Sequence, residues 1–333
     1  MSKYSFAVVV PAYNVEDYLG ECLDSVFSNC FKGISIQVIV VDDGSVDCTY
    51  DIASNYLVHD NFYLFRQENK GQSAARNYGV QNVDAKYIFF VDADDLVENN
   101  LVSGCLEYFT NHDVDMVLYD AKEFYTNKNP VLGDDIYTRP SGCYDQILSP
   151  LEYFNLAVVS NQYNVSPCLY AFRTSVLIDL KFQEGVIYED NLYTTFLLLT
   201  QRVRKLICVN EKYYRRRIRD DSTVTANKKM KHYSDYHTVF SELAQRMDLS
   251  QSVSGYNKYL ASVLAKSIEI ISDITDMNFK QKLYLRFNIL LSVIVDSRLW
   301  YSRVYAAILL GKHYKKLAQK IKAIARKYKW LRF

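Results

Sequence analysis

Short apolar runs alternate with helical patterns through the first 119 residues. The runs at 6–10, 37–42, 62–65 and 87–91 are rich in Val, Ile and Phe, and the stretches 15–27, 47–56 and 73–81 are helical in pattern. The apolar runs are nearly continuous rather than alternating, which is typical of parallel strands buried on both faces. The pattern therefore predicts a doubly wound, Rossmann-like α/β fold with a mostly parallel sheet flanked by helices.

The pattern changes after residue 119. Residues 120–150 hold three of the five prolines, which predicts loops or a short hairpin. Regular patterns then return, with helices expected near 151–158 and 190–200 and strands at 166–172 and 206–209. From residue 230 onward only two glycines interrupt the sequence, and this predicts several helices. We expect an α/β domain over residues 1–225 and a helical C-terminal module over residues 226–333.

Composition narrows the class of protein. The chain has 333 residues, of which 49% are hydrophobic and 23% charged, so it is globular. Every apolar run is far shorter than the roughly 20 residues that cross a bilayer, and the first residues do not resemble a signal peptide. We therefore expect a cytoplasmic protein. The seven cysteines are scattered without a CxxC pair, which predicts neither a disulfide framework nor a zinc site.

Charge is distributed unevenly along the chain. Residues 311–333 contain nine Lys or Arg and no acid, so with a net charge of +1 the other 310 residues carry 1 − 9 = −8. Apolar residues recur in this segment at a heptad-like interval, which predicts a basic amphipathic tail. Such a helix suits the anionic inner face of the cell membrane, and the alternatives are packing on the body or an oligomer contact.

Three acids in four positions follow the strand expected at 87–91. If this segment stays extended, Asp92 and Asp94 project to the same side, about 6–7 Å apart. Two carboxylates on one side can share Mg²⁺ or Mn²⁺ and leave coordination positions open for phosphate oxygens. The alternative is an exposed turn that caps the next helix, a role that suits Asp95.

Polar residues also follow the other expected strands. Pro11 is expected to end the first strand, and Tyr13 beyond it offers its face to a flat ring. Asp42 and Asp43 precede Gly44, which permits a tight turn. An Asp at this place can accept a hydrogen bond from the imide N–H of a uracil. Because ligands of open α/β sheets bind outside the carboxyl ends of the strands, these residues predict a nucleotide site.

A loop with a helix behind it follows the third strand. Asn69 and Gly71 lie in the loop, and Arg76 lies one turn inside the helix expected at 73–81. A helix N-terminus with an arginine nearby suits a diphosphate. Taken singly, each of these features is commonly a turn, a cap or a surface arginine, so the prediction depends on their combination.

The stretches VVVPAYN, VIVVDDGSVDCT, NKGQSAARNYG and YIFFVDADD, in this order, resemble the family 2 glycosyltransferases, which have the GT-A fold. The resemblance implies a nucleotide-sugar donor, usually a UDP-sugar, bound by residues 1–119, and an acceptor half over residues 120–225. It also implies Mg²⁺ or Mn²⁺ at Asp92 and Asp94. The donor-binding residues that it implies are Pro11, Ala12, Tyr13, Asp42, Asp43, Asn69, Arg76 and Asp92.

VIYEDN at 186–191 resembles the ED motif of the same family. Direct displacement at an anomeric carbon needs a carboxylate that takes the proton of the acceptor hydroxyl. The resemblance assigns this role to Asp190, with Glu189 orienting the site. The alternative is that both acids simply favour a helix N-terminus through its dipole.

The segment YYRRRIRDDSTVT at 213–225 contains four arginines in five positions. In the family a similar segment follows the last core strand, and Arg217 and Arg219 match it best. Guanidinium groups there could stabilise the departing diphosphate or bind an anionic acceptor. A patch that binds RNA is the competing interpretation, but no base-stacking module accompanies the arginines, so we expect no nucleic acid partner.

The sequence thus predicts an inverting glycosyltransferase that moves a sugar from a nucleotide-sugar to a hydroxyl of a saccharide or lipid-linked saccharide. One alternative is a nucleotidyltransferase that makes NDP-sugars, although such enzymes have a Gly-rich phosphate loop where this chain has PAYN. The other is a non-catalytic, membrane-associated protein that binds saccharides. An oligomer is left open.

Overall fold

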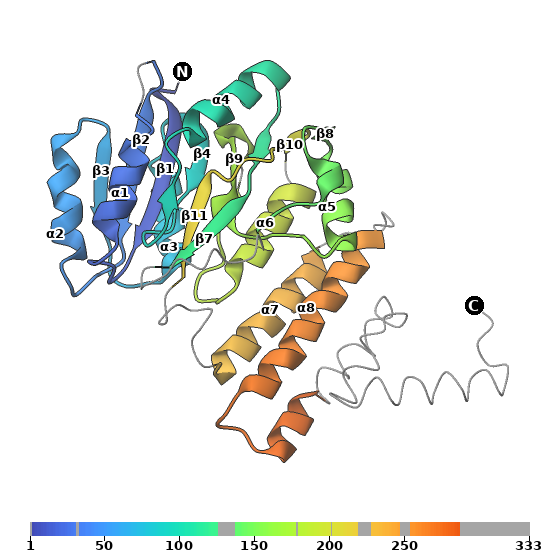
Figure 1. The fold of residues 1–333 in the computed structure, drawn as a ribbon. Coiled ribbons are helices and arrows are strands. Elements are labelled where there is room, and N and C mark those ends of the chain that lie inside the picture. The colour runs from blue at the N-terminus through green and yellow to red at the C-terminus, as the bar shows by residue number, and fades with distance from the viewer. Residues whose placement is uncertain are drawn as a thin grey trace. The chain divides into compact units, whose positions relative to one another are not determined.

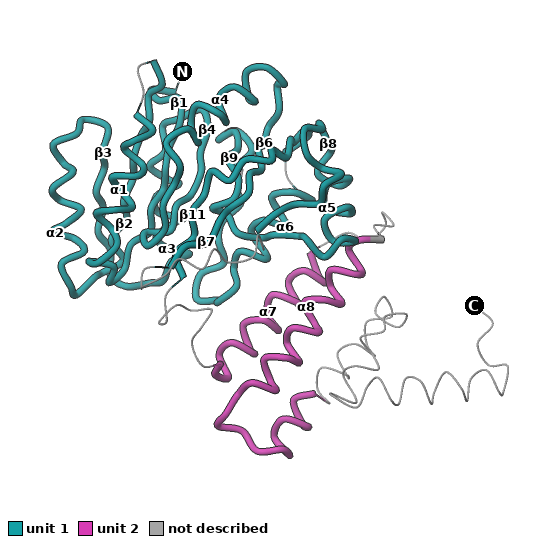
Figure 2. Tube along the Cα trace, viewed as in Figure 1, with its two compact units in different colours: residues 1–226 teal, residues 227–333 magenta. Residues whose placement is uncertain are grey.

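A computed structural model describes residues 2–30, 33–125, 137–177, 179–200, 202–218, 228–246 and 254–286. The chain divides into two compact units, Met1–Ala226 and Asn227–Phe333, coloured separately in Figure 2.

Unit 1 is built on an eight-stranded sheet in the order β3-β2-β1-β4-β9-β6-β10-β8 (Figure 1). Strands β3, β2, β1 and β4 are mutually parallel, and β9 is antiparallel to both of its neighbours. The predicted α/β fold with a mostly parallel sheet is confirmed. The strands are β1 (Tyr4–Ala12), β2 (Ile36–Asp42), β3 (Phe62–Arg66), β4 (Ala85–Phe90), β6 (Met116–Leu118), β8 (Ile147–Leu148), β9 (Tyr170–Arg173) and β10 (Leu206–Cys208).

A second, three-stranded sheet has the order β5-β11-β7. Its strands are β5 (Leu96–Val97), β7 (Ala121–Tyr125) and β11 (Tyr214–Ile218). Sequence analysis missed all three, because β5 has two residues and β11 is mostly arginine. Strand β5 begins immediately after the acids of DADD, so this small sheet fixes the chain that leaves the end of β4.

Helices cover both faces of the large sheet, as Figure 1 shows. Strands β1, β2 and β3 follow one another toward one edge, whereas β4 returns to the other side of β1. Right-handed crossovers therefore place α1 and α2 on one face and α3 on the other. The helices of unit 1 are α1 (Leu19–Phe27), α2 (Thr49–Ser54), α3 (Gln72–Gln81), α4 (Leu101–His112), α5 (Pro150–Val159) and α6 (Glu189–Thr200), with short 3₁₀ turns at Asn55–Val58, Ser141–Cys143, Pro167–Leu169 and Thr174–Val176.

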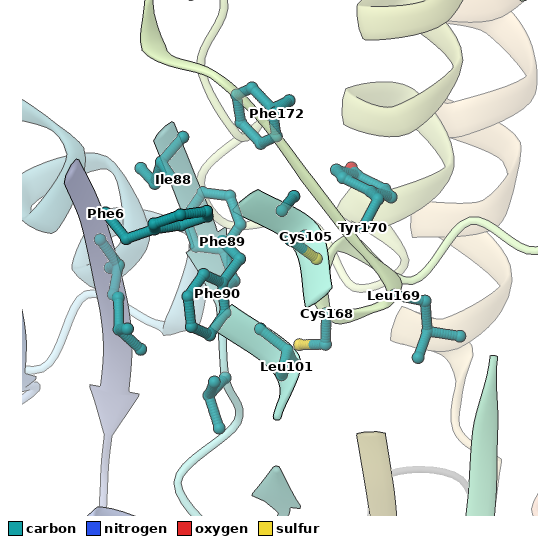
Figure 3. Packing of buried hydrophobic residues seen from close by; sticks show 14 of the residues in the cluster. Phe6, Ile88, Phe89, Phe90, Leu101, Cys105, Cys168, Leu169, Tyr170 and Phe172 are labelled. Carbon is teal, nitrogen blue, oxygen red and sulfur yellow. The ribbon is translucent and has the colours of Figure 1, made fainter. Parts of the chain in front are cut away.

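The hydrophobic core lies where β1, β4 and β9 meet. Figure 3 shows Phe6 beside Phe89, with ring centroids 6.3 Å apart, and Phe172 on the neighbouring strand β9. Phe90 alternates to the other face of the sheet, where its ring centroid lies 6.4 Å from that of Phe172. All seven residues of β2 are buried, including the apolar run at 38–41 and the polar side chains of Gln37 and Asp42. Asp42 is the last residue of the strand, so a buried carboxylate lies where β2 ends.

Pro11 does not end the first strand, contrary to the expectation. Strand β1 continues to Ala12 and pairs with β2 as far as Ala12 and Asp42. Val9 O accepts a hydrogen bond from Val91 N on the β4 side, and alternation along the strand points the Pro11 nitrogen to that same side. Strand β4 has ended there, so the missing N–H of Pro11 removes no ladder hydrogen bond.

Unit 2 contains the helices α7 (Met230–Arg246) and α8 (Ser254–Asp273). The two helices pack against each other, and the Tyr256 hydroxyl on α8 donates to the Leu243 carbonyl on α7. Buried apolar residues line both helices, among them Val239, Phe240 and Leu260. None of the helices in the part of the chain that is described combines the length and the apolar character needed to cross a membrane.

The close contact of α3 with β1 predicts that a methyl group added at Gly79 destabilises the fold. A Cβ at Gly79 would lie 2.5 Å from Val9 Cγ1, so we expect Gly79→Ala to lower the free energy of unfolding by about 1–3 kcal/mol through overpacking. At Gly20 on α1 a Cβ would meet its nearest neighbour, Ile52, at 4.0 Å. Gly20→Ala should therefore raise the same quantity by up to about 1 kcal/mol through helix propensity. Urea unfolding checks both, and equal effects of the two substitutions would contradict the packing.

Candidate active site

Strands β1 and β2 end side by side at the edge where the site lies. The Asp43 amide donates to the Ala12 carbonyl over 2.8 Å, which joins the two strand ends. Tyr13 follows with a side chain that is about half exposed. The buried carboxylate of Asp42 accepts a hydrogen bond from the Ser45 amide, and Arg66 Nε lies 3.0 Å from its other oxygen. The structure thus brings Ala12, Tyr13 and the two acids together.

The carboxylate of Asp43 holds the loop that enters α3. Its Oδ1 accepts from Gln67 Nε2 (2.7 Å) and the Lys70 amide (2.9 Å), and Oδ2 accepts from the Gly71 amide (2.8 Å). Asn69 lies exposed in this loop. A carboxylate has about four acceptor positions, so Asp43 orders the loop and keeps roughly one position for a ligand.

Gly44 allows this loop to come close. Its φ is +74°, and a Cβ there would lie 2.9 Å from the Asn69 amide nitrogen. A side chain at this position would therefore both strain the backbone and displace the loop. The DDGS turn and the loop with Asn69 form one packed structure.

The acids of DADD lie in a turn rather than on an extended strand. Strand β4 ends at Phe90, and the Asp95 amide donates to the Asp92 carbonyl over 2.9 Å. The expectation that Asp92 and Asp94 alternate along an extended segment is therefore wrong. The turn is also not the exposed helix cap weighed as the alternative, because Asp95 is buried and strand β5 follows it. The cause is Asp95, whose buried carboxylate accepts from the Tyr214 hydroxyl (2.7 Å) and the Arg217 amide (2.6 Å) of β11.

Arg76 joins the turn after β4 to the start of α6. Its Nη2 donates to Asp92 Oδ1 over 2.7 Å, and its Nη1 donates to Glu189 Oε1 over 2.8 Å. Only 3% of its side chain is exposed. Burial disfavours the charge, but the two carboxylates outweigh this and raise the pKa of Arg76 above its ordinary value. Because both terminal nitrogens already bind carboxylates, Arg76 positions acids from both halves of unit 1.

Asp190 is the second residue of α6 and shares the environment of Glu189. The amide and side chain of Asn191 both donate to Asp190 Oδ1 over 2.9 Å, whereas Oδ2 accepts no hydrogen bond from any described residue. Burial, followed by the charge of Glu189, raises the pKa of Asp190 to about 7. A carboxylate with this pKa and one open oxygen is equipped to take up a proton near neutral pH.

Arg217 extends from β11 to the DADD turn. Its Nε donates to the Asp94 carbonyl over 2.7 Å, and its Nη2 donates to Glu21 Oε2 on α1 over 2.6 Å. The guanidinium also lies over the rings of Tyr18 and Phe124. The structure therefore places Arg217 beside the acids. Arg219 and the basic segment 311–333 lie outside the described residues.

The described residues contain no group of three or more His, Cys, Asp and Glu side chains placed to hold a metal ion. Mg²⁺ or Mn²⁺ that is bound together with phosphates needs only one or two carboxylates from the protein. Asp92 fits this requirement, because its Oδ2 accepts no hydrogen bond from a described residue and 31% of its side chain is exposed. After burial, the charges of Asp94 and Asp92 raise the pKa of Asp95, so the negative potential at this turn favours a cation.

The comparisons with known proteins agree with this arrangement. A family model described as "Glycosyl transferase family 2" matches residues 7–167. Over these residues the chain belongs to this family. The crystal structure of S. aureus TarS 1–349 in complex with UDP superposes with a TM-score of 0.66 at 20% identity, over 94% of this chain and 87% of TarS 1–349. This similarity confirms the GT-A fold.

Three similar curated proteins are bacterial. Glycosyltransferase GlyA of Streptococcus pneumoniae is 30% identical over 65% of this chain, and GlyG of the same organism is 28% identical over 71%. The minor teichoic acid biosynthesis protein GgaB of Bacillus subtilis is 24% identical over 86%. The matched part of the chain spans 31% of GlyA and of GgaB and 78% of GlyG.

The Arg76 contacts predict a large loss of stability when the guanidinium is removed. Arg76→Ala leaves Asp92 and Glu189 partly buried without their cation, so we expect the free energy of unfolding to fall by about 3–5 kcal/mol. Arg246→Ala, which breaks an exposed pair with Glu242, should change it by less than about 0.5 kcal/mol. Urea unfolding measures both variants. A loss for Arg76→Ala as small as that of the control would contradict the role given to this pair.

Proposed function

We propose that this family 2 enzyme is an inverting glycosyltransferase that moves a sugar from a nucleotide-sugar, in the first instance a UDP-sugar, to a hydroxyl of a saccharide or lipid-linked saccharide. The observation that carries the proposal is the pair of contacts that Arg76 makes. They connect Asp92, which follows strand β4 at the edge proposed to bind the nucleotide, with Glu189. Glu189 lies next to Asp190, the carboxylate suited to act as a base. An inverting transfer needs a donor site and a base facing each other in this way.

The donor side is assigned to the carboxyl ends of β1, β2 and β4 in residues 1–119. Tyr13 is available to contact the nucleobase. Asp43 keeps one acceptor position for an N–H group of that nucleobase. The structures of S. aureus TarS 1–349 with UDP and with UDP-GlcNAc support a uridine nucleotide by analogy of fold. Residues 120–225 supply the base and are assigned to the acceptor.

Asp92 and Asp94 are the residues that would hold Mg²⁺ or Mn²⁺. A divalent ion there would neutralise charge on the diphosphate as it leaves. A mannosyltransferase from Pyrobaculum calidifontis, solved with GDP-mannose and Mn²⁺, has a related fold with a TM-score of 0.52. Arg217 lies at the same turn and would add a positive charge beside the leaving group.

The chemical step is assigned to Asp190. Its Oδ2 accepts the proton of the acceptor hydroxyl while the hydroxyl oxygen forms a bond to the anomeric carbon. The bond between that carbon and the diphosphate oxygen breaks, and the nucleoside diphosphate leaves with the electron pair. Because the nucleophile attacks opposite the leaving group, the configuration inverts. Glu189, fixed by Arg76, keeps the start of α6 in place.

Two points of the proposal concern partners. GgaB is named for minor teichoic acid biosynthesis, which supports an acceptor that belongs to a bacterial surface polymer. Attachment to an anionic membrane surface through the basic tail stays a prediction, because the structure does not describe residues 287–333.

The assignment of the base predicts a pH profile. Wild-type turnover, measured as UDP released from a UDP-sugar, should rise about tenfold per pH unit below pH 7 and level off above it, because only ionised Asp190 can take the proton. Asp190→Asn should bind UDP normally and lose this turnover, whereas Asp60→Asn, an exposed acid, should behave as wild type. Full turnover by Asp190→Asn would exclude Asp190 as the base.

The metal assignment predicts an effect on binding that is independent of turnover. Removing divalent ions with EDTA should weaken UDP binding to the wild type, as measured by calorimetry, and Mn²⁺ should restore it. Asp94→Asn should bind UDP with the same weak affinity whether or not Mn²⁺ is present. If EDTA leaves the wild-type affinity unchanged, Asp92 and Asp94 do not hold a metal with the nucleotide.

A further inference from the structure

The segment 182–190 leads into the proposed base and is held by a neighbour of Arg76. Asn77 lies next to Arg76 on α3 and is buried, with 7% of its surface exposed. Its Nδ2 donates to the Phe182 carbonyl over 3.0 Å, and its Oδ1 accepts from the Phe182 amide over 2.8 Å. The side-chain amide thus pairs with the backbone of Phe182 as a neighbouring strand would.

Phe182 is also fixed through its ring. The ring stacks on Tyr193 of α6, with centroids 3.7 Å apart and planes within 5°, and it meets Phe90 of β4 edge-on at 5.3 Å. The Arg76 guanidinium lies 5.1 Å from the centroid of the same ring. Phe182 is therefore a buried fixed point from which the segment runs to Glu189 and Asp190.

Between the two ends the backbone adopts an unfavourable conformation. Gly185 has a φ of +75° and Tyr188 a φ of +71°. For a tyrosine the left-handed region costs about 1–2 kcal/mol, so the segment does not hold this path by local preference alone. It is held at its start by Asn77 and at its end by Arg76, both on α3.

We propose that Asn77 is a positioning residue for the transfer reaction, acting through Phe182 on the placement of Asp190 relative to the donor. This inference rests on the proposed function. The side-chain hydrogen bonds of Asn77 go to Phe182 and Glu184, and none goes to the nucleotide-binding acids or to Asp190. Loss of the Asn77 side chain should therefore free the start of the segment and displace the base while the nucleotide site stays intact. A displacement of about 1 Å from the productive geometry is enough to lower kcat roughly 100-fold.

The experiment combines amide hydrogen exchange, UDP binding in the presence of Mn²⁺, and turnover on the full chain with Asn77→Ala. We expect faster exchange of the amides in residues 182–190 with unchanged exchange in α3 and unchanged UDP affinity. We also expect kcat to fall by about 10- to 100-fold with the donor KM unaltered. Turnover is measured with whichever of UDP-GlcNAc, UDP-GalNAc, UDP-glucose or UDP-galactose the wild type hydrolyses fastest.

Two further variants keep the test decisive. Asn77→Asp preserves the size of the side chain and the acceptor for the Phe182 amide. It removes the donor to the Phe182 carbonyl and places a second carboxylate beside Glu184, so it should show the same changes even if Asn77→Ala folds poorly. Asn82→Ala deletes an asparagine side chain at the end of the same helix, where Nδ2 binds the Tyr78 carbonyl. It should match the wild type in all three measurements.

The proposal is overturned if Asn77→Ala exchanges like the wild type in residues 182–190, or if exchange is faster but kcat is unchanged. It is also overturned if UDP affinity falls by the same factor as kcat, because Asn77 would then support α3 as a whole. Failure of the proposed function would appear in the wild type itself, as an absence of UDP binding and release. The exchange comparison does not depend on that outcome.

Discussion

The buried guanidinium of Arg76 is the interaction on which the site depends. It lies between Asp92, which follows β4, and Glu189, which begins α6, two residues separated by nearly a hundred positions in the chain. Removing this charge from water is costly, and only contacts with both carboxylates offset that cost. The two ion pairs of Arg76 therefore fix the relative positions of Asp92 and Glu189 more than they add to the free energy of unfolding. If either carboxylate moves away, the guanidinium loses a partner that water cannot replace.

This constraint links the two halves of unit 1. The donor residues follow strands that are fixed by a continuous apolar core, so their positions come from the sheet itself. The segment that leads to the base has a less favourable backbone conformation, because Tyr188 has a positive φ. Neighbouring side chains of helix α3 hold this segment, with Arg76 at one end and Asn77 at the other. The same helix packs tightly on β1 at Gly79. Helix α3 therefore fixes the position of the proposed base relative to the strand ends that are proposed to bind the donor.

Much of this could be predicted from sequence, and the successes share a physical origin. Strands β1 to β4 are largely apolar runs, so their approximate positions and the polar residues that follow them could be predicted. The expected helix near Asp190 begins at Glu189. The failures involve contacts between distant residues. Asp95 is paired with Tyr214, 119 positions away, and this contact turns DADD away from the extended form. Likewise, nothing local to RRR in β11 indicates that Arg217 extends back to Asp94.

Pro11 and Arg76 illustrate what residue type alone does not predict. Each was interpreted by residue type, as a strand breaker and as a ligand for diphosphate. Strand β1 tolerates Pro11 because β4 has already ended on that side. Arg76 has both terminal nitrogens engaged by carboxylates, and this engagement could not be inferred without knowing where α6 begins.

The most direct test of the central claim is a crystal structure of the full chain with UDP and Mn²⁺. The account predicts the nucleotide at the carboxyl ends of β1, β2 and β4, with the metal ion bound directly by a carboxylate oxygen of Asp94 or Asp92. It also predicts that Arg76 still binds Glu189 and that Asp190 faces the diphosphate end of the ligand. A nucleotide bound elsewhere, or a structure in which Arg76 has left Glu189 and Asp190 points away from the diphosphate, would contradict it.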